Sequence, residues 1–217
     1  MHPSLTTANT QGTLAKTGPS GSFAEDLMIL QRLRTETRPH HDRLDNHPLM
    51  VQLMSPAVSR PLYESILKKF LGFYQSVEPH LAAFDHWPSL DINLKEKLKT
   101  PSLLRDLSSL NVMAKDIPSS PAPDWIHDEA SAMGNFYVME GSTLGGQIIT
   151  RHVASRLHLS PDNGLAFFSS YGDAVGVRWK ETRDALVRFA EQSHAEDVMI
   201  ESAKKTFEAL ATWLDKN

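Results

Sequence analysis

The chain has 217 residues, 41% of them hydrophobic and 22% charged, which are the proportions of a globular protein with one sizeable core. A net charge of −4 argues against a nucleic-acid partner, and the lack of cysteine excludes disulfides, thiolate metal sites and cysteine nucleophiles. The sequence has neither a secretory signal nor an apolar run of roughly 18 residues that could span a membrane, so we expect a cytoplasmic protein.

The first predicted element is an N-terminal arm. Residues 1–22 are rich in Ser, Thr, Gly and Pro. They contain too few apolar groups to offset the entropy of ordering, so we predict a mobile arm ahead of one helical domain over residues 23–217. From Phe23 onward, apolar residues recur at steps of three and four, which predicts a helix as far as Leu44. Pro39 should kink this helix, because proline removes a backbone donor and clashes with the preceding turn.

A short helical segment over residues 47–53 and a long core helix come next. Ser59, two residues before Pro61, marks the start of the long helix, behind which apolar residues recur at helical spacing. Residues 86–123 contain five prolines and a weaker periodicity. We therefore expect only two short helices there, near residues 93–99 and 102–110.

Three further helices are predicted in the second half of the chain. Asp124 is expected to cap the first of them, whose apolar pattern continues to Leu157. The second runs over about residues 172–192. Ser193 and Glu196 match a capping box at the start of the last helix. Because no segment has the two-residue period of a strand, the fold is predicted to be all-α.

Three glycines interrupt the apolar pattern of the helix that ends near Leu157. They are Gly141, Gly145 and Gly146. Each costs about 0.5–1 kcal/mol relative to alanine in a helix, so together they should weaken and bend it. One reason for such a run is a large flat ligand lying against the backbone; the other is close helix packing, or a helix that ends at Gly141. Neither a phosphate loop nor a dinucleotide-binding glycine pattern is present.

This run resembles the distal helix of the heme oxygenase family, in which glycines let the backbone lie directly over haem. The string E-G-S-T-L-G at residues 140–145 is similar to the proteobacterial members. Animal members have an aspartate, which organises distal water, at the position of Ser142; here backbone groups, Ser142 or water would take that task. The resemblance implies that Gly141, Ser142, Gly145 and Gly146 are the catalytic residues.

A second resemblance lies about 100 residues earlier in the chain. Leu33, Thr37 and His41 share one helix face, which carries apolar residues and should turn inward. The pattern L-R-x-x-T-x-x-x-H over residues 33–41 resembles the first helix of heme oxygenases, whose histidine binds iron. His41 is therefore the expected metal ligand, and Thr37 is expected to bind the cofactor. The alternatives are a core histidine bonded to a carbonyl, and His40 as the ligand if Pro39 rotates the helix.

Cations should meet the two propionates of haem. By resemblance we expect Arg34, Tyr137 and Lys180 to bind the cofactor, with Arg178 as the second choice to Lys180. An ordinary solvated charge explains each cation nearly as well. A basic rim could also steer an acidic electron donor, although a solvated helix face is an equal explanation. Its members would be Arg34, Arg151, His152, Arg156 and Lys180.

The resemblance implies an all-α, single-domain heme-oxygenase-like fold, with haem between a proximal helix and a kinked, glycine-bearing distal helix. It implies O₂-dependent cleavage of haem, which is both cofactor and substrate, to biliverdin, carbon monoxide and ferrous iron. The electron donor would be a ferredoxin or a flavoprotein reductase. The string G-S-T-L-G-G-Q is nearest to members associated with bacterial phytochromes, so a bacteriophytochrome is a candidate receiver of biliverdin.

Two other functions remain open at this stage. A haem carrier or sensor on the same fold would keep His41 but would not need the glycine helix. A purely helical interaction protein would bind no haem. The thiamine-degrading relatives of this fold use a cysteine nucleophile, which this chain does not have.

Overall fold

A computed structural model describes residues 22–216, with side chains from Met28 onward. Residues 1–21, most of the predicted arm, and residue 217 lie outside the described residues, so the arm and the domain boundary stay predictions. Within the described range every regular element is helical, apart from isolated bridges from Ser160 to Asn163 and Gly164. In chain order the elements are α1 (Ser22–Asp45), α2 (Pro48–Leu53), α3 (Arg60–Ala82), η1 (Trp87–Leu90), α4 (Leu94–Lys97), α5 (Thr100–Ser109), α6 (Glu129–Leu157), α7 (Ala166–Ser169), η2 (Gly172–Ala174), α8 (Val175–Ser193) and α9 (Glu196–Leu214).

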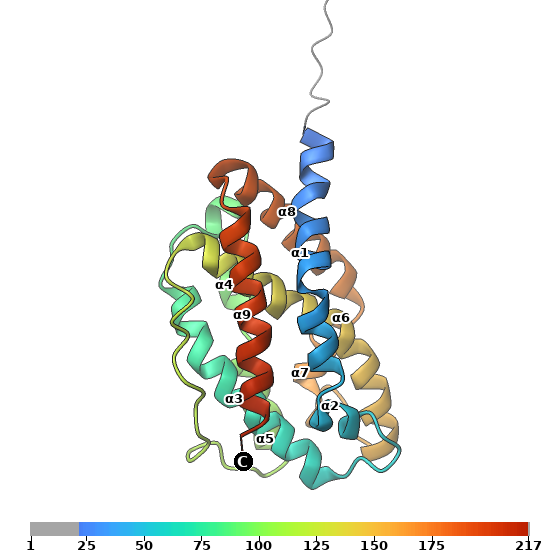
Figure 1. Ribbon diagram of the computed structural model, residues 1–217. Coiled ribbons are helices and arrows are strands. Elements are labelled where there is room, and N and C mark those ends of the chain that lie inside the picture. Colours follow the sequence, from blue (N-terminus) through green and yellow to red (C-terminus); the bar gives the residue numbers. More distant parts are fainter. Residues whose placement is uncertain (1–21, 217) are drawn as a thin grey trace, which may run out of the picture.

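The long helices pack around α6. Helices α7, α8 and α9 all pack against α6, and α1 packs mainly against α9 and α8. In Figure 1, α1 (blue) lies beside α9 (red), and α6 passes behind α1. Helix α6 comes very close to α9 at Gly134, where a Cβ would lie 2.0 Å from the carbonyl oxygen of Met199. None of the described helices is long and apolar enough to cross a membrane.

Proline and glycine are both tolerated inside these helices. Helix α1 continues through Pro39, which lies at an exposed position, so this proline does not end the helix. Helix α6 continues for 29 residues through all three glycines, so the alternative that it ends at Gly141 is wrong. Tertiary packing along both helices outweighs the local propensity of these residues.

The helix caps agree with the sequence in one case and differ in two. The Ser59 hydroxyl accepts a hydrogen bond from the Leu62 amide at 3.4 Å, as expected for the start of α3. Helix α6 is capped by Asp128 and not by Asp124. The reason is Ser131, whose backbone N–H donates to Asp128 at 2.7 Å and whose hydroxyl accepts from the Asp128 amide at 3.0 Å.

The capping box predicted at Ser193 does not form. Helix α8 extends through Ser193, and the His194 amide then closes it by donating to the Ala190 carbonyl at 2.9 Å. His194 adopts the left-handed conformation with φ 50°, so the turn to α9 starts after it and Ala195 is the N-cap. A hydroxyl still inside one helix cannot cap the next.

Candidate functional site

The three glycines of α6 have different surroundings. A Cβ on Gly146 would lie 2.6 Å from the carbonyl oxygen of Phe168, so Gly146 is needed for the close packing of α6 on α7. A Cβ on Gly145 would meet nothing within 4 Å, and one on Gly141 would lie 3.6 Å from the Trp179 ring, an ordinary contact. Packing within the described fold therefore explains Gly146, contrary to the expectation that it faces a ligand, but explains neither Gly141 nor Gly145.

Gly141 and Gly145 belong to a face of α6 that the fold leaves uncovered. At helical spacing this face carries Tyr137, Gly141, Leu144, Gly145 and Ile148, and we call it the glycine face. Gly145 is exposed, and the side chains of Leu144 and Ile148 are 41% and 56% exposed. Bare backbone beside exposed apolar side chains is a surface that an apolar ligand can cover.

The glycine face is tied to the N-terminal elements at both ends. At one end, Tyr137 lies close to α1: burial raises its pKa, while the Thr37 hydroxyl and the Arg34 guanidinium oppose that rise. At the other end, the ring Nε2 of His152 hydrogen-bonds with the carbonyl oxygen of Ser55, just beyond α2, at 3.0 Å. The two ties are 15 residues apart on α6, or about 22 Å.

His41 lies on the stretch of chain between these two ties. The face of α1 that buries Leu33 and Thr37 opens at His41, whose side chain is 54% exposed instead of turning into the core. Its Nδ1 lies 3.0 Å from a carboxylate oxygen of Asp45, and its ring meets Phe207 edge-on at 5.7 Å. No described residue bonds to Nε2 of His41, so this nitrogen is free to bind a metal.

His40 has a different environment. Its Nδ1 lies 3.2 Å from Glu208 on α9, and its side chain is only 24% exposed. The neighbouring helix therefore holds His40, whereas His41 is the more open of the two rings. This difference favours His41 as the candidate ligand.

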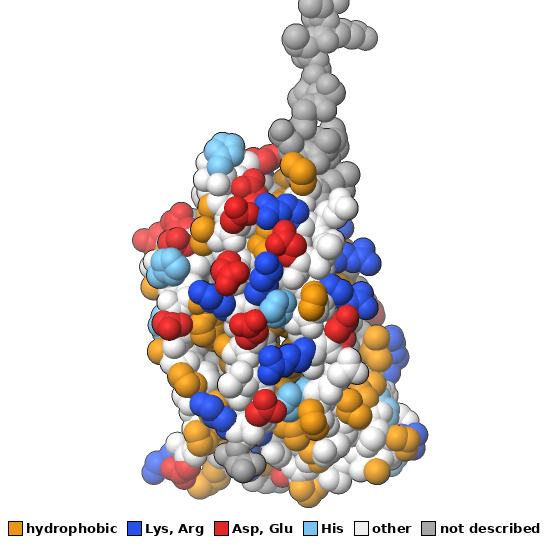
Figure 2. All heavy atoms as spheres, in the orientation of Figure 1, with side chains coloured by type: hydrophobic (Ala, Val, Ile, Leu, Met, Phe, Trp, Pro, Cys, Tyr) orange, Lys and Arg blue, Asp and Glu red, His pale blue; other side chains and the backbone are white. Residues whose placement is uncertain are grey.

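Apolar side chains also flank this region on the α2 side. Val51 and Met54 are 53% and 37% exposed. Figure 2 shows apolar side chains gathered over α2 and the adjoining end of α6, whereas acidic and basic side chains alternate over α1 and α9. The region between α1, α2 and the glycine face thus offers a histidine nitrogen, bare backbone and apolar surfaces.

The predicted cations and Ser142 occupy distinct positions. Arg34 is exposed and acts on Tyr137, at one end of the glycine face. Lys180 is 67% exposed and bonds to Asp184 at 2.6 Å, and Arg178 pairs with Glu181 at 3.2 Å. The Ser142 hydroxyl donates to the Met139 carbonyl at 2.7 Å. Of these groups, only Arg34 interacts with a residue of the glycine face, Tyr137, in the described structure.

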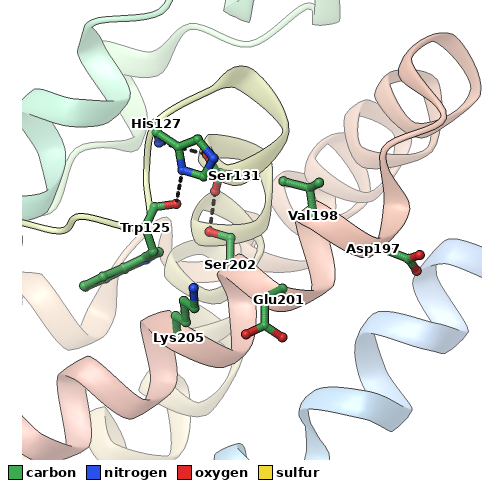
Figure 3. Close-up of a pocket in the computed structure, with 8 residues that line it drawn as sticks. All are labelled: Trp125, His127, Ser131, Asp197, Val198, Glu201, Ser202 and Lys205. Atoms are coloured by element: carbon green, nitrogen blue, oxygen red, sulfur yellow. Dashed lines mark hydrogen bonds between the residues drawn. The ribbon is translucent and has the colours of Figure 1, made fainter.

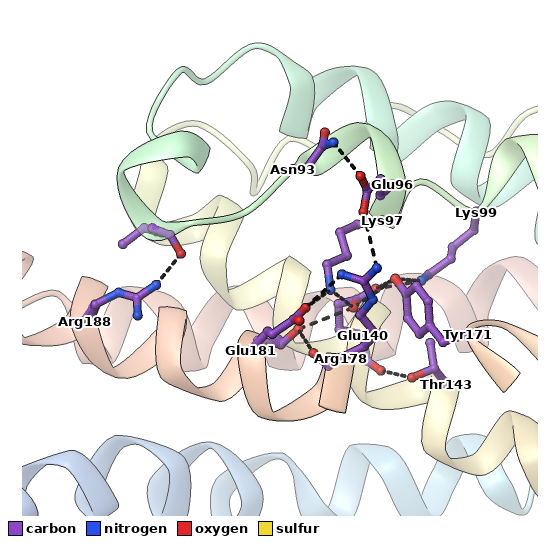
Figure 4. Close-up of polar contacts among 12 residues, drawn as sticks. Asn93, Glu96, Lys97, Lys99, Glu140, Thr143, Tyr171, Arg178, Glu181 and Arg188 are labelled. Carbon is purple, nitrogen blue, oxygen red and sulfur yellow. Dashed lines mark hydrogen bonds and ion pairs between the residues drawn. The ribbon is translucent and has the colours of Figure 1, made fainter. Parts of the chain in front are cut away.

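A buried charged cluster, which the sequence analysis missed, lies beneath the glycine helix (Figure 4). We call it the Glu140 cluster, and its members are Glu140, Lys97, Lys99, Tyr171 and Thr182. The carboxylate of Glu140, 1% exposed, lies 2.6 Å from the Lys99 ammonium and 3.2 Å from that of Lys97. The hydroxyl of Tyr171 donates to the same carboxylate at 2.9 Å.

The electrostatics of the Glu140 cluster follow from its burial. Burial lowers the pKa of Lys99, against the opposing effect of Glu140. The pKa of Tyr171 is raised by burial and by Glu140. Because Glu140 directly precedes Gly141, the cluster anchors α6 at the point where the glycine face begins its bare stretch.

Tyr74 of α3 is a second buried residue behind α6 that the sequence did not reveal. Burial raises its pKa, and an interaction with Ser142 partly opposes that rise. Its contact with Ser142 gives the distal serine a hydroxyl neighbour.

A surface pocket of about 300 Å³ lies elsewhere, between the start of α6 and α9 (Figure 3). Its lining consists of Trp125, His127, Ser131, Asp197, Val198, Glu201, Ser202 and Lys205. None of these residues belongs to the glycine face or neighbours His41, so the pocket is separate from the candidate site.

A helical fold, a histidine whose Nε2 has no described partner, and a helix face with exposed glycine backbone are together what a protein that holds a flat ligand with a metal at its centre requires. The family model of heme oxygenases matches residues 27–216. The chain belongs to the heme oxygenase family.

Solved structures support the same fold. The chain is similar to the heme oxygenase of Neisseria meningitidis, with a TM-score of 0.73 and 24% identity over 86% of this chain and 89% of that one. It is also similar to the heme oxygenase of Leptospira interrogans, with a TM-score of 0.70 and 18% identity over 85% of this chain and 97% of that one. For heme oxygenase-1 of the cyanobacterium Synechocystis, solved in complex with heme, the TM-score is 0.69 and the identity 16%, over 86% of this chain and 90% of that one. No curated protein sequence matches the chain.

Proposed function

We propose that this chain is a heme oxygenase that binds haem between His41 and the glycine face and cleaves it to biliverdin, carbon monoxide and ferrous iron. The observation that carries the proposal is the missing packing reason for Gly141 and Gly145. Each glycine costs about 0.5–1 kcal/mol in a helix, yet no described neighbour of these two needs the space that a Cβ would fill. A flat ligand lying on the backbone would need that space.

The residues of the region fit haem in its chemistry. Neutral imidazole is a common iron ligand, and Nε2 of His41 is free for that role. The macrocycle is apolar and flat, which suits the bare backbone at Gly145 and the exposed Leu144 and Ile148. The propionates are anionic, and the Arg34 guanidinium next to Tyr137 lies at one end of the glycine face.

Asp45 orients the ligand histidine. With its carboxylate 3.0 Å from Nδ1 of His41, Asp45 accepts the Nδ1–H bond and leaves the lone pair on Nε2. This tautomer is the one that can bind iron through Nε2. Asp45 lies one turn after His41 on the same helix, so the arrangement depends on α1 remaining helical beyond Pro39.

On the side of the site opposite His41, the chain contributes the bare backbone of the glycine face and few acidic side chains. Haem, when bound, supplies the iron that activates O₂ and the macrocycle that is oxidised. Of the five residues of the glycine face, only Tyr137 is titratable. We infer that protons reach this side through water and hydroxyls, among them the hydroxyl of Ser142, which directly follows Gly141 and has Tyr74 behind it.

The proposal includes partners beyond haem and O₂. An electron-donor protein, a ferredoxin or a flavoprotein reductase, must supply electrons, and the exposed Arg34, Arg151 and Arg156 suit an acidic donor surface. The sequence resemblance supports a bacteriophytochrome as the receiver of biliverdin. A cytoplasmic location stays a prediction.

The test is a hemin titration followed by reduction under air. We expect one hemin per chain, a Soret band of a histidine-ligated ferric haem, and replacement of that band by biliverdin absorption after ascorbate is added. Binding without biliverdin formation would instead make the protein a haem carrier or sensor. A failure to bind hemin at all would refute the proposed site.

A further inference from the structure

Trp179 of α8 lies beside the glycine face at Gly141. Its ring atoms Cη2 and Cζ3 lie 3.6 and 3.8 Å from the point where a Cβ on Gly141 would be. Its ring centroid is 5.8 Å from that of Tyr137, at an angle of 48°. The indole therefore occupies the space beside the first glycine of the face.

The neighbours of Trp179 on α8 point elsewhere. Arg178 lies over the Tyr171 ring, 5.9 Å from its centroid, and pairs with Glu181, while Lys180 bonds to Asp184. Successive residues on a helix point about 100° apart, so only one of three consecutive side chains can face a given neighbour. Of residues 178–180, Trp179 is the one that lies against Gly141 and Tyr137 of the glycine face.

The indole N–H of Trp179 is also available as a donor. The chain has four tryptophans. The N–H groups of the other three donate to Leu81, Thr206 and Lys69. No described residue accepts a hydrogen bond from the fourth, and Trp179 is only half-buried. The Trp179 ring packs near Tyr137, whose pKa Arg34 also affects, so its free N–H is a further donor at that end of the face.

We propose that Trp179 is a specificity-determining residue that fixes the in-plane orientation of haem, an inference that rests on the proposed haem site. The indole borders the macrocycle at the Gly141 end, so the centre of the macrocycle lies nearer Gly145. Its N–H, with Arg34 and Tyr137, draws a carboxylate to the same end. Because the two carboxylates of haem lie on one edge, holding that edge determines which meso carbon is presented to the bare backbone.

The experiment compares two substitutions by the proton NMR spectrum of the ferric cyanide complex, in which the haem methyl signals report the populations of in-plane orientations. The Trp179→Phe variant keeps a flat ring but loses the N–H, and Trp179→Leu loses both. We expect one dominant orientation in the unmodified protein. We expect the ratio of major to minor orientation to fall about tenfold or more in both variants, since a tenfold change equals 1.4 kcal/mol.

Trp213→Phe is the matched control. Trp213 packs against α3, at Gly72, and its N–H donates to the Lys69 carbonyl at 2.7 Å, so this change should leave the ratio unaltered. An unchanged ratio in Trp179→Leu, with hemin bound through an intact iron–histidine bond, would overturn the role of Trp179 while leaving the haem site standing. If the ratio changed in Trp179→Leu but not in Trp179→Phe, the proposed hydrogen bond from the indole N–H would be overturned, and the ring's steric role would remain. An unmodified protein that binds no hemin would overturn the proposed function itself.

Discussion

Two adjacent glycines of α6 should respond in opposite ways to the same substitution. Gly145→Ala adds a methyl group to an exposed helical position with no neighbour within 4 Å. Alanine is better than glycine in a helix by about 0.5–1 kcal/mol, so the apoprotein should become more stable by about that amount. For a chain of this size, 1 kcal/mol corresponds to a rise in melting temperature of about 2–4 °C.

Gly146→Ala gains the same helix propensity but loses more in packing. Its Cβ would lie 2.6 Å from the Phe168 carbonyl oxygen, a backbone atom that cannot rotate away. Overpacking of this kind costs about 1–3 kcal/mol, so the net effect should be a destabilisation of about 1–2 kcal/mol. Because both alanines gain the same helix propensity, the two variants should separate by the packing cost alone, about 1–3 kcal/mol in free energy of unfolding.

Haem binding should reverse the order of the two variants. The Cβ added at Gly145 would occupy the surface proposed for the macrocycle, so Gly145→Ala should weaken hemin binding, and Gly145→Leu should weaken it further. The assays are urea unfolding of the apoprotein and a Soret titration with hemin. Equal destabilisation by both alanines would contradict the difference between an open Gly145 and a packed Gly146. Normal hemin affinity and biliverdin yield in Gly145→Leu would remove the reason given for the bare backbone.

Three further substitutions test the rest of the site. His41→Ala should abolish the iron–histidine signal until imidazole is added, whereas His40→Ala should keep it; resonance Raman spectra of the ferrous complexes decide, and the reverse pattern would make His40 the ligand. Arg34→Ala should still bind hemin but give a mixture of biliverdin isomers, with Lys180→Ala adding less because Lys180 already bonds to Asp184 at 2.6 Å; a single unchanged isomer on chromatography would mean that Arg34 is only solvated. Glu140→Ala should cost about 3–5 kcal/mol in urea unfolding, because it takes from the buried Lys99 its hydrogen-bonded carboxylate and leaves Lys97 only Glu181, 3.6 Å away. Adding Lys99→Met to it should recover part of that loss, and strictly additive losses would contradict the coupling.

The long helices were predictable because their apolar period extends over many residues. Helices α3 and α6 bury their stripes in the core as expected, and the Ser59 cap is a local signal that the structure confirms. The start of α6 was predicted wrongly, at Asp124, because the return bond from Ser131 that makes Asp128 the cap cannot be seen in the apolar pattern. Helix ends depend on such single hydrogen bonds, which a pattern of apolar residues does not contain.

For the candidate site, the sequence indicated which residues to consider but not the separate surroundings of each. The glycine run indicated a close approach, yet only the tertiary structure distinguishes Gly146, packed on Phe168, from Gly145, which meets nothing. The exposure of His41 could not be foreseen, because the same helix face buries Thr37 one turn earlier. The Glu140 cluster joins residues 97, 99, 140 and 171, and no local pattern links positions so far apart in the chain.

The Glu140 cluster also limits how this sequence can diverge. Losing Glu140 takes from the buried Lys99 its hydrogen-bonded carboxylate and leaves Lys97 only the more distant Glu181, at 3.6 Å, whereas losing one lysine still leaves an ion pair with Glu140. A single change at position 140 is therefore costly, while either lysine can change first. Relatives that have lost the glutamate before the first glycine should also have replaced Lys99, so that positions 99 and 140 change together.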